Sequence, residues 1–250
     1  MKLTRWFWLP ILAGCAGAPA APDERTIWLE TCARHGYSAV ETAMATGLEV
    51  SEIARRAVAA PAPAAFTILP YPGGRHPRIG FLDGAIDPHR DTKFSLFLPG
   101  GGYALVDFPE ALWADGELQY LAHTHIPTAW DKKGVRLPRM DWSRRPDGGL
   151  EARRVLPDGL EFSARVTPSA SGADMELRIR NGSDRLRKGV RVQVCVMLKG
   201  APGFEAQTKT NKRHLPDALC AARSEDGARW LAGRFERAKT WDNPPCPCIH

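Results

Sequence analysis

The sequence predicts a mainly β protein, an antiparallel β-sandwich with a small helical element at its N-terminus. Short runs of alternating apolar and polar residues recur from residue 93 to residue 199, and turn dipeptides such as Asp158-Gly159 and Asn181-Gly182 separate them. Before residue 66 the apolar residues recur with a helical period instead. With 250 residues, of which 44% are hydrophobic and 25% charged, the chain can bury a substantial core.

The first 20 residues have the order of a secretory signal peptide. Two basic residues precede an apolar run over 6–13, which is too short to span a bilayer, and small residues follow. Leu12-Ala13-Gly14-Cys15 resembles the lipobox of bacterial lipoproteins, which would make Cys15 the acylated first residue of the mature protein. Ordinary cleavage near Ala18 is the alternative. We therefore expect an exported protein of the cell envelope, either periplasmic or held at the membrane through a lipid anchor only.

Residues 21–65 predict a tether, a helical hairpin and a linker. A helix over Tyr37–Thr46 is followed by Gly47, which suits a helix C-terminus, and Ser51 suits the N-cap of a second helix over 52–59. The Ala- and Pro-rich run over 59–65 predicts a linker, so we place the domain boundary near residue 65.

The same hairpin has the spacing of a helix-turn-helix motif. Ala43, Gly47, Leu48 and Ile53 stand where that motif needs small, turn and apolar residues, but Arg56 replaces a further apolar residue. An export signal also argues against a cytoplasmic DNA partner. Nucleic-acid binding is therefore a remote alternative, and the simpler interpretation is a hairpin that covers one end of the sandwich.

Residues 66–250 predict the β-sandwich domain. The expected strands cover 93–98, 103–108, 150–156, 160–167, 174–180 and 190–199. The last strand places five apolar residues on one face and Arg191, Gln193, Cys195, Met197 and Lys199 on the other. The apolar face predicts the core between two sheets, and the second face suits a shallow concave surface. Alternatively, Cys195 and Met197 lie beneath a loop.

This second face, and the polar segment 203–212 beyond it, predict a site for carbohydrate or another anionic or polar envelope ligand. The candidate ligand-binding residues are His123, His125, Arg191, Gln193, Lys199, Gln207, Asn211 and Lys212. Trp130, Trp142, Trp230 and Trp241 could stack on sugar rings or lie in the core.

The positive charge of the chain is concentrated in one region. The formal net charge is +6, and residues 132–191 hold fifteen Lys and Arg against eight Asp and Glu, so this region carries the whole excess. Such a region suits an anionic partner, namely an acidic polysaccharide, lipid headgroups or nucleic acid. The alternative is a solvated face of the sheet on which arginines alternate.

Two constellations could hold zinc or copper. His123 and His125 form an H-x-H pair, whose imidazoles point to one side on a strand. A third ligand could come from Asp87, His89, Asp91 or Asp131. The spacing resembles the first cupin motif, but Ala129 and Trp130 stand where a cupin has its glutamate. Histidines that anchor a loop by hydrogen bonds are the alternative.

Cys246, Cys248 and His250 form the second constellation, a C-x-C-x-H sequence at the end of the chain. The other cysteines are Cys15, Cys32, Cys195 and Cys220. In an oxidising compartment, disulfides from Cys246 and Cys248 to Cys195 and Cys220 compete with metal binding. We favour the disulfides, because export has more support than a third and a fourth metal ligand.

Four blocks of the sequence carry a resemblance. They are GFLDGAIDPHRDTKFSLF, YLAHTHIPTAWDKKG, LRIRNGSDRLRKGVRVQVCVMLKG and WDNPPCPCIH. Over residues 70–250 they resemble a group of uncharacterised bacterial exported proteins, whose members continue past the CPCIH block, so the resemblance implies a sandwich domain truncated at its C-terminus. The strand pattern is similar to galactose-mutarotase-like supersandwich domains, whose concave sheet binds sugars and whose epimerases use histidines with a carboxylate.

His123 and His125 could stand for those histidines, but no glutamate of this chain matches the carboxylate, so catalysis does not carry over. We therefore expect a protein that binds carbohydrate on a concave sheet face. The alternative is a metal-dependent enzyme or metal-binding protein built on His123 and His125.

Overall fold

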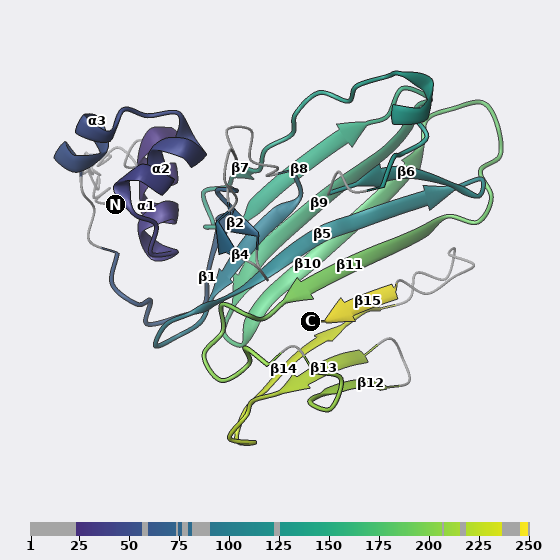
Figure 1. Cartoon of the computed structure of the whole chain (residues 1–250). Helices are drawn as coiled ribbons and strands as arrows, with labels where there is room; N and C mark the ends of the chain where they lie inside the picture. Colours follow the sequence, from purple (N-terminus) through teal and green to yellow (C-terminus); the bar gives the residue numbers. More distant parts are fainter. Residues whose placement is uncertain are drawn as a thin grey trace, which may run out of the picture.

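The computed structural model describes residues 24–56, 60–73, 75–76, 80–81, 91–122, 126–206, 208–215, 219–236 and 246–249. Its architecture confirms the predicted fold class: antiparallel sheets pack into a sandwich, and a small helical element precedes them (Figure 1). Within the described part of the chain, no helix is long and apolar enough to cross a bilayer.

A six-stranded sheet forms one layer of the sandwich. It contains β1 (Thr67–Pro70), β4 (Lys93–Phe97), β5 (Tyr103–Ala114), β6 (Glu117–Leu121), β11 (Arg191–Met197) and β15 (Cys246–Ile249). The strand order is β1-β4-β5-β11-β15, and β6 pairs with the second half of β5. All pairs are antiparallel except β11 with β15, which is parallel.

The second layer is a four-stranded sheet of order β10-β9-β8-β7. Its strands are β7 (Ser143–Arg144), β8 (Leu150–Val155), β9 (Leu160–Ser169) and β10 (Gly172–Asn181). On β8, every second residue from Leu150 is buried and the residues between them are exposed, as period-two alternation requires.

The main core lies between the two layers and contains Phe94, Leu112 and Phe162, which are fully buried, with Trp130 and Trp142 beside them. Burying one such side chain stabilises the fold by about 1.5–3 kcal/mol. The predicted apolar face of β11 is part of this core, since Val192 and Val194 are buried in it.

Smaller elements complete the structure. They are β2 (Arg75–His76), β3 (Gly80–Phe81), the 3-10 helix η1 (Asp131–Lys133), β12 (Lys212–Leu215), β13 (Leu219–Arg223) and β14 (Trp230–Arg234). The strands β12, β13 and β14 form a three-stranded sheet beside β15 (Figure 1). A second core between them and the sandwich includes Phe204, Cys220 and Ile249.

The helical element consists of α1 (Glu24–Arg34), α2 (Ala39–Thr46) and α3 (Val50–Arg55). Gly47 adopts the left-handed conformation at the end of α2, as predicted. Ser51 is not the N-cap of α3: the helix begins earlier, at Val50, so Glu49 takes the N-cap position. A tether was predicted at the start of residues 21–65, whereas α1 already begins at Glu24.

The helical element covers one end of the sheet face that is turned away from the sandwich core, which we call the outer face. The Nε2 atom of His35 lies 2.7 Å from the Ser95 hydroxyl on β4. The His35 ring also contacts the rings of Tyr71, Phe97 and Tyr103 edge-on. These contacts hold the end of α1 against the sheet.

Candidate functional site

The outer face of the six-stranded sheet brings together polar residues from β4, β5 and β11. Asp107 on β5 lies opposite Lys93 on β4 and opposite Cys195 on β11. Leu105 lies opposite Met197, and both are buried together with Cys195. One half of the outer face is therefore covered, and a charged pair is enclosed within it.

Lys93 and Asp107 form this buried pair. The Nζ atom lies 3.8 Å from Asp107 Oδ1, and the two side chains are 6% and 0% exposed. Lys93 Nζ also donates to the Ala122 carbonyl, and the Trp142 indole donates to the Lys93 carbonyl at 2.9 Å. Desolvation of each ion costs several kcal/mol, so a buried pair adds little to stability and is instead a candidate for binding or chemistry.

The two sequence segments with the predicted metal-binding histidines border described residues close to this pair in the sequence. Ala122 is the last described residue before the H-x-H pair, and Asp91 follows the IDPHR sequence. His89, His123, His125 and Asp87 themselves lie outside the described residues, as does His250. The described part of the chain holds no group of three His, Cys, Asp or Glu side chains that could bind a metal ion.

Asp131, Cys246 and Cys248 are also predicted metal ligands, and the structure describes their positions. Asp131 accepts hydrogen bonds from the backbone N–H and the hydroxyl of Thr128, at 2.8 and 2.7 Å, and so closes a turn. Cys246 and Cys248 belong to β15, where the backbone of Cys248 lies opposite that of Cys195. The side chains of these two terminal cysteines are outside the described set.

The other half of the outer face contains what we call the outer strip: Glu110, Trp113, Arg191 and Gln193. Arg191 is exposed and the other three are half-buried. Trp113 is half-buried and lies opposite Arg191, whose guanidinium carbon is 5.4 Å from the centre of the indole ring. Gln193 Nε2 donates to Glu110 Oε2 at 2.6 Å. An aromatic face, a carboxylate, an amide and a guanidinium are thus adjacent on one surface.

The predicted ligand-binding residues separate in the structure. Arg191 and Gln193 lie in the outer strip, whereas Lys199 is exposed in the turn after β11. Asn211 and Lys212 lie at the start of β12 in the three-stranded sheet. Lys212 Nζ donates to the Thr208 carbonyl at 2.6 Å and to Asn211 Oδ1 at 3.0 Å, so polar groups of this segment form hydrogen bonds with one another. Gln207 lies outside the described residues.

The predicted tryptophans that the structure describes are not in the outer strip. Trp130 and Trp142 are core residues, and Trp230 is exposed on β14. Trp241 is outside the described chain. Trp113 was not predicted, because Pro109 suggested that the strand ended at Phe108. The available signal was the apolar run over 111–114 before the turn dipeptide Asp115-Gly116.

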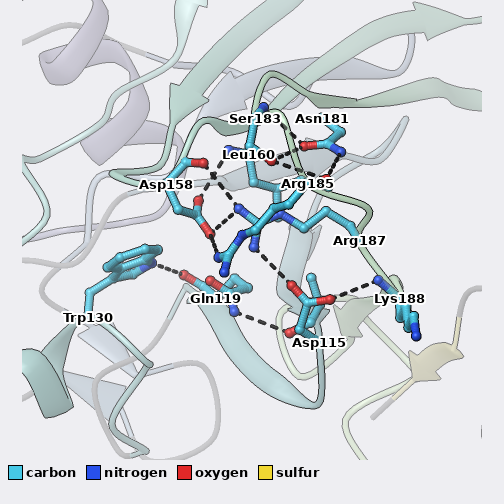
Figure 2. A network of polar contacts seen from close by, with 11 residues as sticks. Asp115, Gln119, Trp130, Asp158, Leu160, Asn181, Ser183, Arg185, Arg187 and Lys188 are labelled. Carbon is cyan, nitrogen blue, oxygen red and sulfur yellow. Dashed lines mark hydrogen bonds and ion pairs between the residues drawn. The ribbon is translucent and has the colours of Figure 1, made fainter.

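A second group of polar residues lies at the end of the sandwich and was also not predicted (Figure 2). Arg187, whose side chain is 3% exposed, donates from Nη1 to Asp115 Oδ2 at 3.0 Å and from Nη2 to the Asp158 carbonyl at 3.1 Å and to the Asp158 carboxylate. The Lys188 backbone N–H donates to Asp115 Oδ1 at 2.8 Å. This N–H first, and then the Arg187 guanidinium, lower the pKa of Asp115 below its ordinary value.

These bonds join three turns, namely β5–β6, β8–β9 and the loop from β10 to β11. The Gly182 N–H adds a bond of 2.9 Å to the Gly159 carbonyl. A cavity of about 300 Å³ lies beside the joined turns, and Lys133, Arg185, Lys188, Glu117 and Gln119 contribute to its lining. Lys133 belongs to η1, and the other four residues come from the β5–β6 hairpin and the β10–β11 loop.

Comparison of the chain with family models, with curated proteins and with solved structures gives no match. No residue role is therefore transferred from another protein, and the function must be inferred from the two polar groups described above.

Proposed function

We propose that the protein is an exported, lipid-anchored β-sandwich protein that binds carbohydrate at the outer strip. The observation that supports this most is the half-buried Trp113 with polar groups on the same surface. A sugar ring presents an apolar C–H face, which stacks on an indole, and hydroxyl groups at its edge, which need donors and acceptors. Glu110, Gln193 and Arg191 supply both kinds of group. The resemblance to galactose-mutarotase-like domains points to the same ligand class.

The test is titration of the mature protein with a glycan panel, followed by titration of a Trp113→Ala variant with each glycan that binds. We expect the variant to lose at least about tenfold in affinity, which corresponds to about 1.4 kcal/mol. Trp113→Phe should retain much of the binding, because it keeps an aromatic face.

Trp230 offers a matched control. Trp230 is 52% exposed, and its ring centre lies 5.8 Å from the guanidinium carbon of Arg223. Trp230 and Arg223 thus form a pair on another sheet that resembles Trp113 with Arg191. Trp230→Ala should leave the affinity unchanged. The proposal is wrong if no glycan binds at millimolar concentration, or if both tryptophan variants lose affinity equally.

Metal-dependent chemistry is the second candidate function. One observation favours it: the buried Asp107 and Lys93 lie at Ala122, after which His123 and His125 follow directly. Elemental analysis of the purified protein should then find one zinc or copper ion per chain, and the ion should be lost in a His123→Ala, His125→Ala variant. A metal-free wild-type preparation that still binds glycan would exclude this candidate.

A further inference from the structure

The excess positive charge lies in residues 132–149 and 182–191 and not in the strands β8, β9 and β10. Residues 132–149 hold six Lys and Arg against two Asp, and residues 182–191 hold four against one, whereas residues 150–181 hold five of each. In the structure, 150–181 forms β8, β9 and β10. Their exposed charges pair with one another, for example Arg153 with Glu161 at 2.7 Å. Arginines such as Arg153, Arg178 and Arg180 do lie on solvated sheet faces, but acidic residues of the same strands balance their charge.

The beginning of the first basic segment and the middle of the second meet at the cavity at the end of the sandwich, whereas Arg144 lies at the opposite end of β8. Lys133 comes from the first segment, and Arg185 and Lys188 come from the second. Two of the acidic residues there, Asp115 and Asp158, bind the buried Arg187 (Figure 2). Asp158 Oδ2 also lies 3.7 Å from Arg185 Nη2. With Glu117, the lining holds three carboxylates against four cations, namely Lys133, Arg185, Arg187 and Lys188, so its net charge is +1. The cavity therefore favours a ligand with negative charge.

Gln119 gives a second and independent indication of a ligand. Gln119 is 2% exposed, and its Nε2 donates to the Ala114 carbonyl at 3.2 Å. Among the described residues, no donor reaches its Oε1 and no acceptor reaches Arg187 Nε. A buried polar group without a partner costs about 1–3 kcal/mol. A ligand that carries hydroxyl groups as well as an acidic group could supply both partners.

The cavity and the outer strip lie at the same end of the six-stranded sheet. Trp113 precedes Asp115 by two residues on β5, and the Asp115 N–H donates to the Lys188 carbonyl at 2.7 Å. Arg191 begins β11 three residues after Lys188. One oligosaccharide could therefore contact the strip with one residue and the cavity with the next.

We propose that this cavity binds the carboxylate-bearing residue of an acidic glycan, so that the ligand class is a polysaccharide that contains uronic acid. The inference rests on the proposed function, because the outer strip supplies the contact to the neighbouring sugar. An anionic lipid surface is the rival source of negative charge. The glycan is favoured by the adjacent Trp113 and by the unpaired Gln119 Oε1, which needs a hydroxyl donor.

The experiment compares trigalacturonate with its methyl ester, which has the same sugar backbone without the charges. Calorimetric titration of the mature protein at low salt should give at least tenfold tighter binding of the acid, and the difference should shrink as salt is added. An Arg185→Ala, Lys188→Ala variant should lose this preference for the acid.

The matched control is Arg178→Ala, Arg180→Ala, which removes the same charge from exposed positions of β10 and should keep the preference. Equal affinity of the wild type for acid and ester overturns the inference and leaves the proposed function intact. Loss of the preference in both variants also overturns it, because the effect would then be unspecific. So does binding to anionic phospholipid vesicles without binding to trigalacturonate. If neither sugar ligand nor any other glycan binds, the proposed function itself has failed.

Discussion

Position 182 requires glycine because of a close neighbouring residue, and not because of its own backbone conformation. Asn181-Gly182 was predicted as a turn because both residue types tolerate positive φ, and Gly159 does have a φ of +84°. Gly182 lies outside the left-handed region, however. A Cβ atom at this position would lie 2.7 Å from the Gly159 carbonyl oxygen, so only glycine allows the two turns to touch.

Gly182→Ala should therefore destabilise the protein. Overpacking of this kind costs about 1–3 kcal/mol, because backbone must move to relieve it. Gly233→Ala is the control, since its nearest neighbour, Cys220 Sγ, would be at an ordinary 3.5 Å. Urea denaturation of both variants measures the difference. Equal stability of the two would show that the β10–β11 loop moves away freely and that the contact is unimportant.

Asp115 should contribute to the acid sensitivity of the fold. Its pKa is lowered in the folded state, so its ionised form stabilises the protein above the ordinary aspartate range, and this contribution is lost as the pH falls through that range. Asp115→Asn should be less stable than the wild type at neutral pH and should lose less stability on acidification. Thermal unfolding at several pH values tests this.

Asp174→Asn on exposed β10 is the control for that series, because the described structure gives Asp174 no ion pair. Its stability curve should follow that of the wild type. If the Asp115 and Asp174 variants have curves of the same shape, the bonds from Lys188 and Arg187 do not hold Asp115 in solution.

Among the elements, the parallel pairing of β11 with β15 determines which cysteine lies near the terminal cysteines. The backbones of Cys195 and Cys248 are partners in the register. Neighbouring strands lie about 4.8 Å apart, which is within the Cα separation that a disulfide bridges. We expect a disulfide between Cys195 and Cys248 in the exported protein, which would fix β15 to the sheet.

Mass spectrometry of unreduced peptides should find this linkage, and reduction should lower the melting temperature. Cys32→Ser, a buried cysteine of α1, should not change the linkage. Intact thiols at Cys246 and Cys248 together with a stoichiometric metal ion would contradict the disulfide and support the metal site.

The sequence predicted the strands with clear alternation and turn residues, and missed others for identifiable reasons. The core of β8, β9 and β11 follows directly from period two. The second half of β5 was missed because Pro109 interrupts it, and β13 because its LCAAR sequence lacks alternation. For α1, the Trp28, Leu29 and Cys32 spacing and the Glu30–Arg34 ion pair were available signals.

The candidate site was predictable only where one strand supplies it. Alternation along β11 gave Arg191 and Gln193. The cavity at the sandwich end combines Gln119, Lys133, Asp158 and the loop over 185–188. These segments are far apart in the sequence, and each looks like an ordinary charged turn. Only the packing of the two sheets shows that they meet.

At the scale of the whole molecule, export remains a prediction, because residues 1–23 lie outside the described structure. Cys15→Ser should abolish lipid labelling and release the protein from the membrane fraction. A fusion that replaces residues 1–20 with a cleavable signal lacking a lipobox is the control, and it should appear soluble in the periplasm. An unprocessed wild-type chain in the cytoplasm would contradict export and, with it, the expected disulfide.

The separation of charge described above also affects how a ligand arrives. The strands β8, β9 and β10 are electrically balanced, and Lys133, Arg185, Arg187 and Lys188 gather at the cavity end of the sandwich. A long polyanion in solution is therefore attracted to that end before any contact forms, and the protein meets it in one preferred orientation. Such steering acts on the rate of encounter, which ionic strength should slow strongly, while the lifetime of the complex formed with Trp113 should change much less.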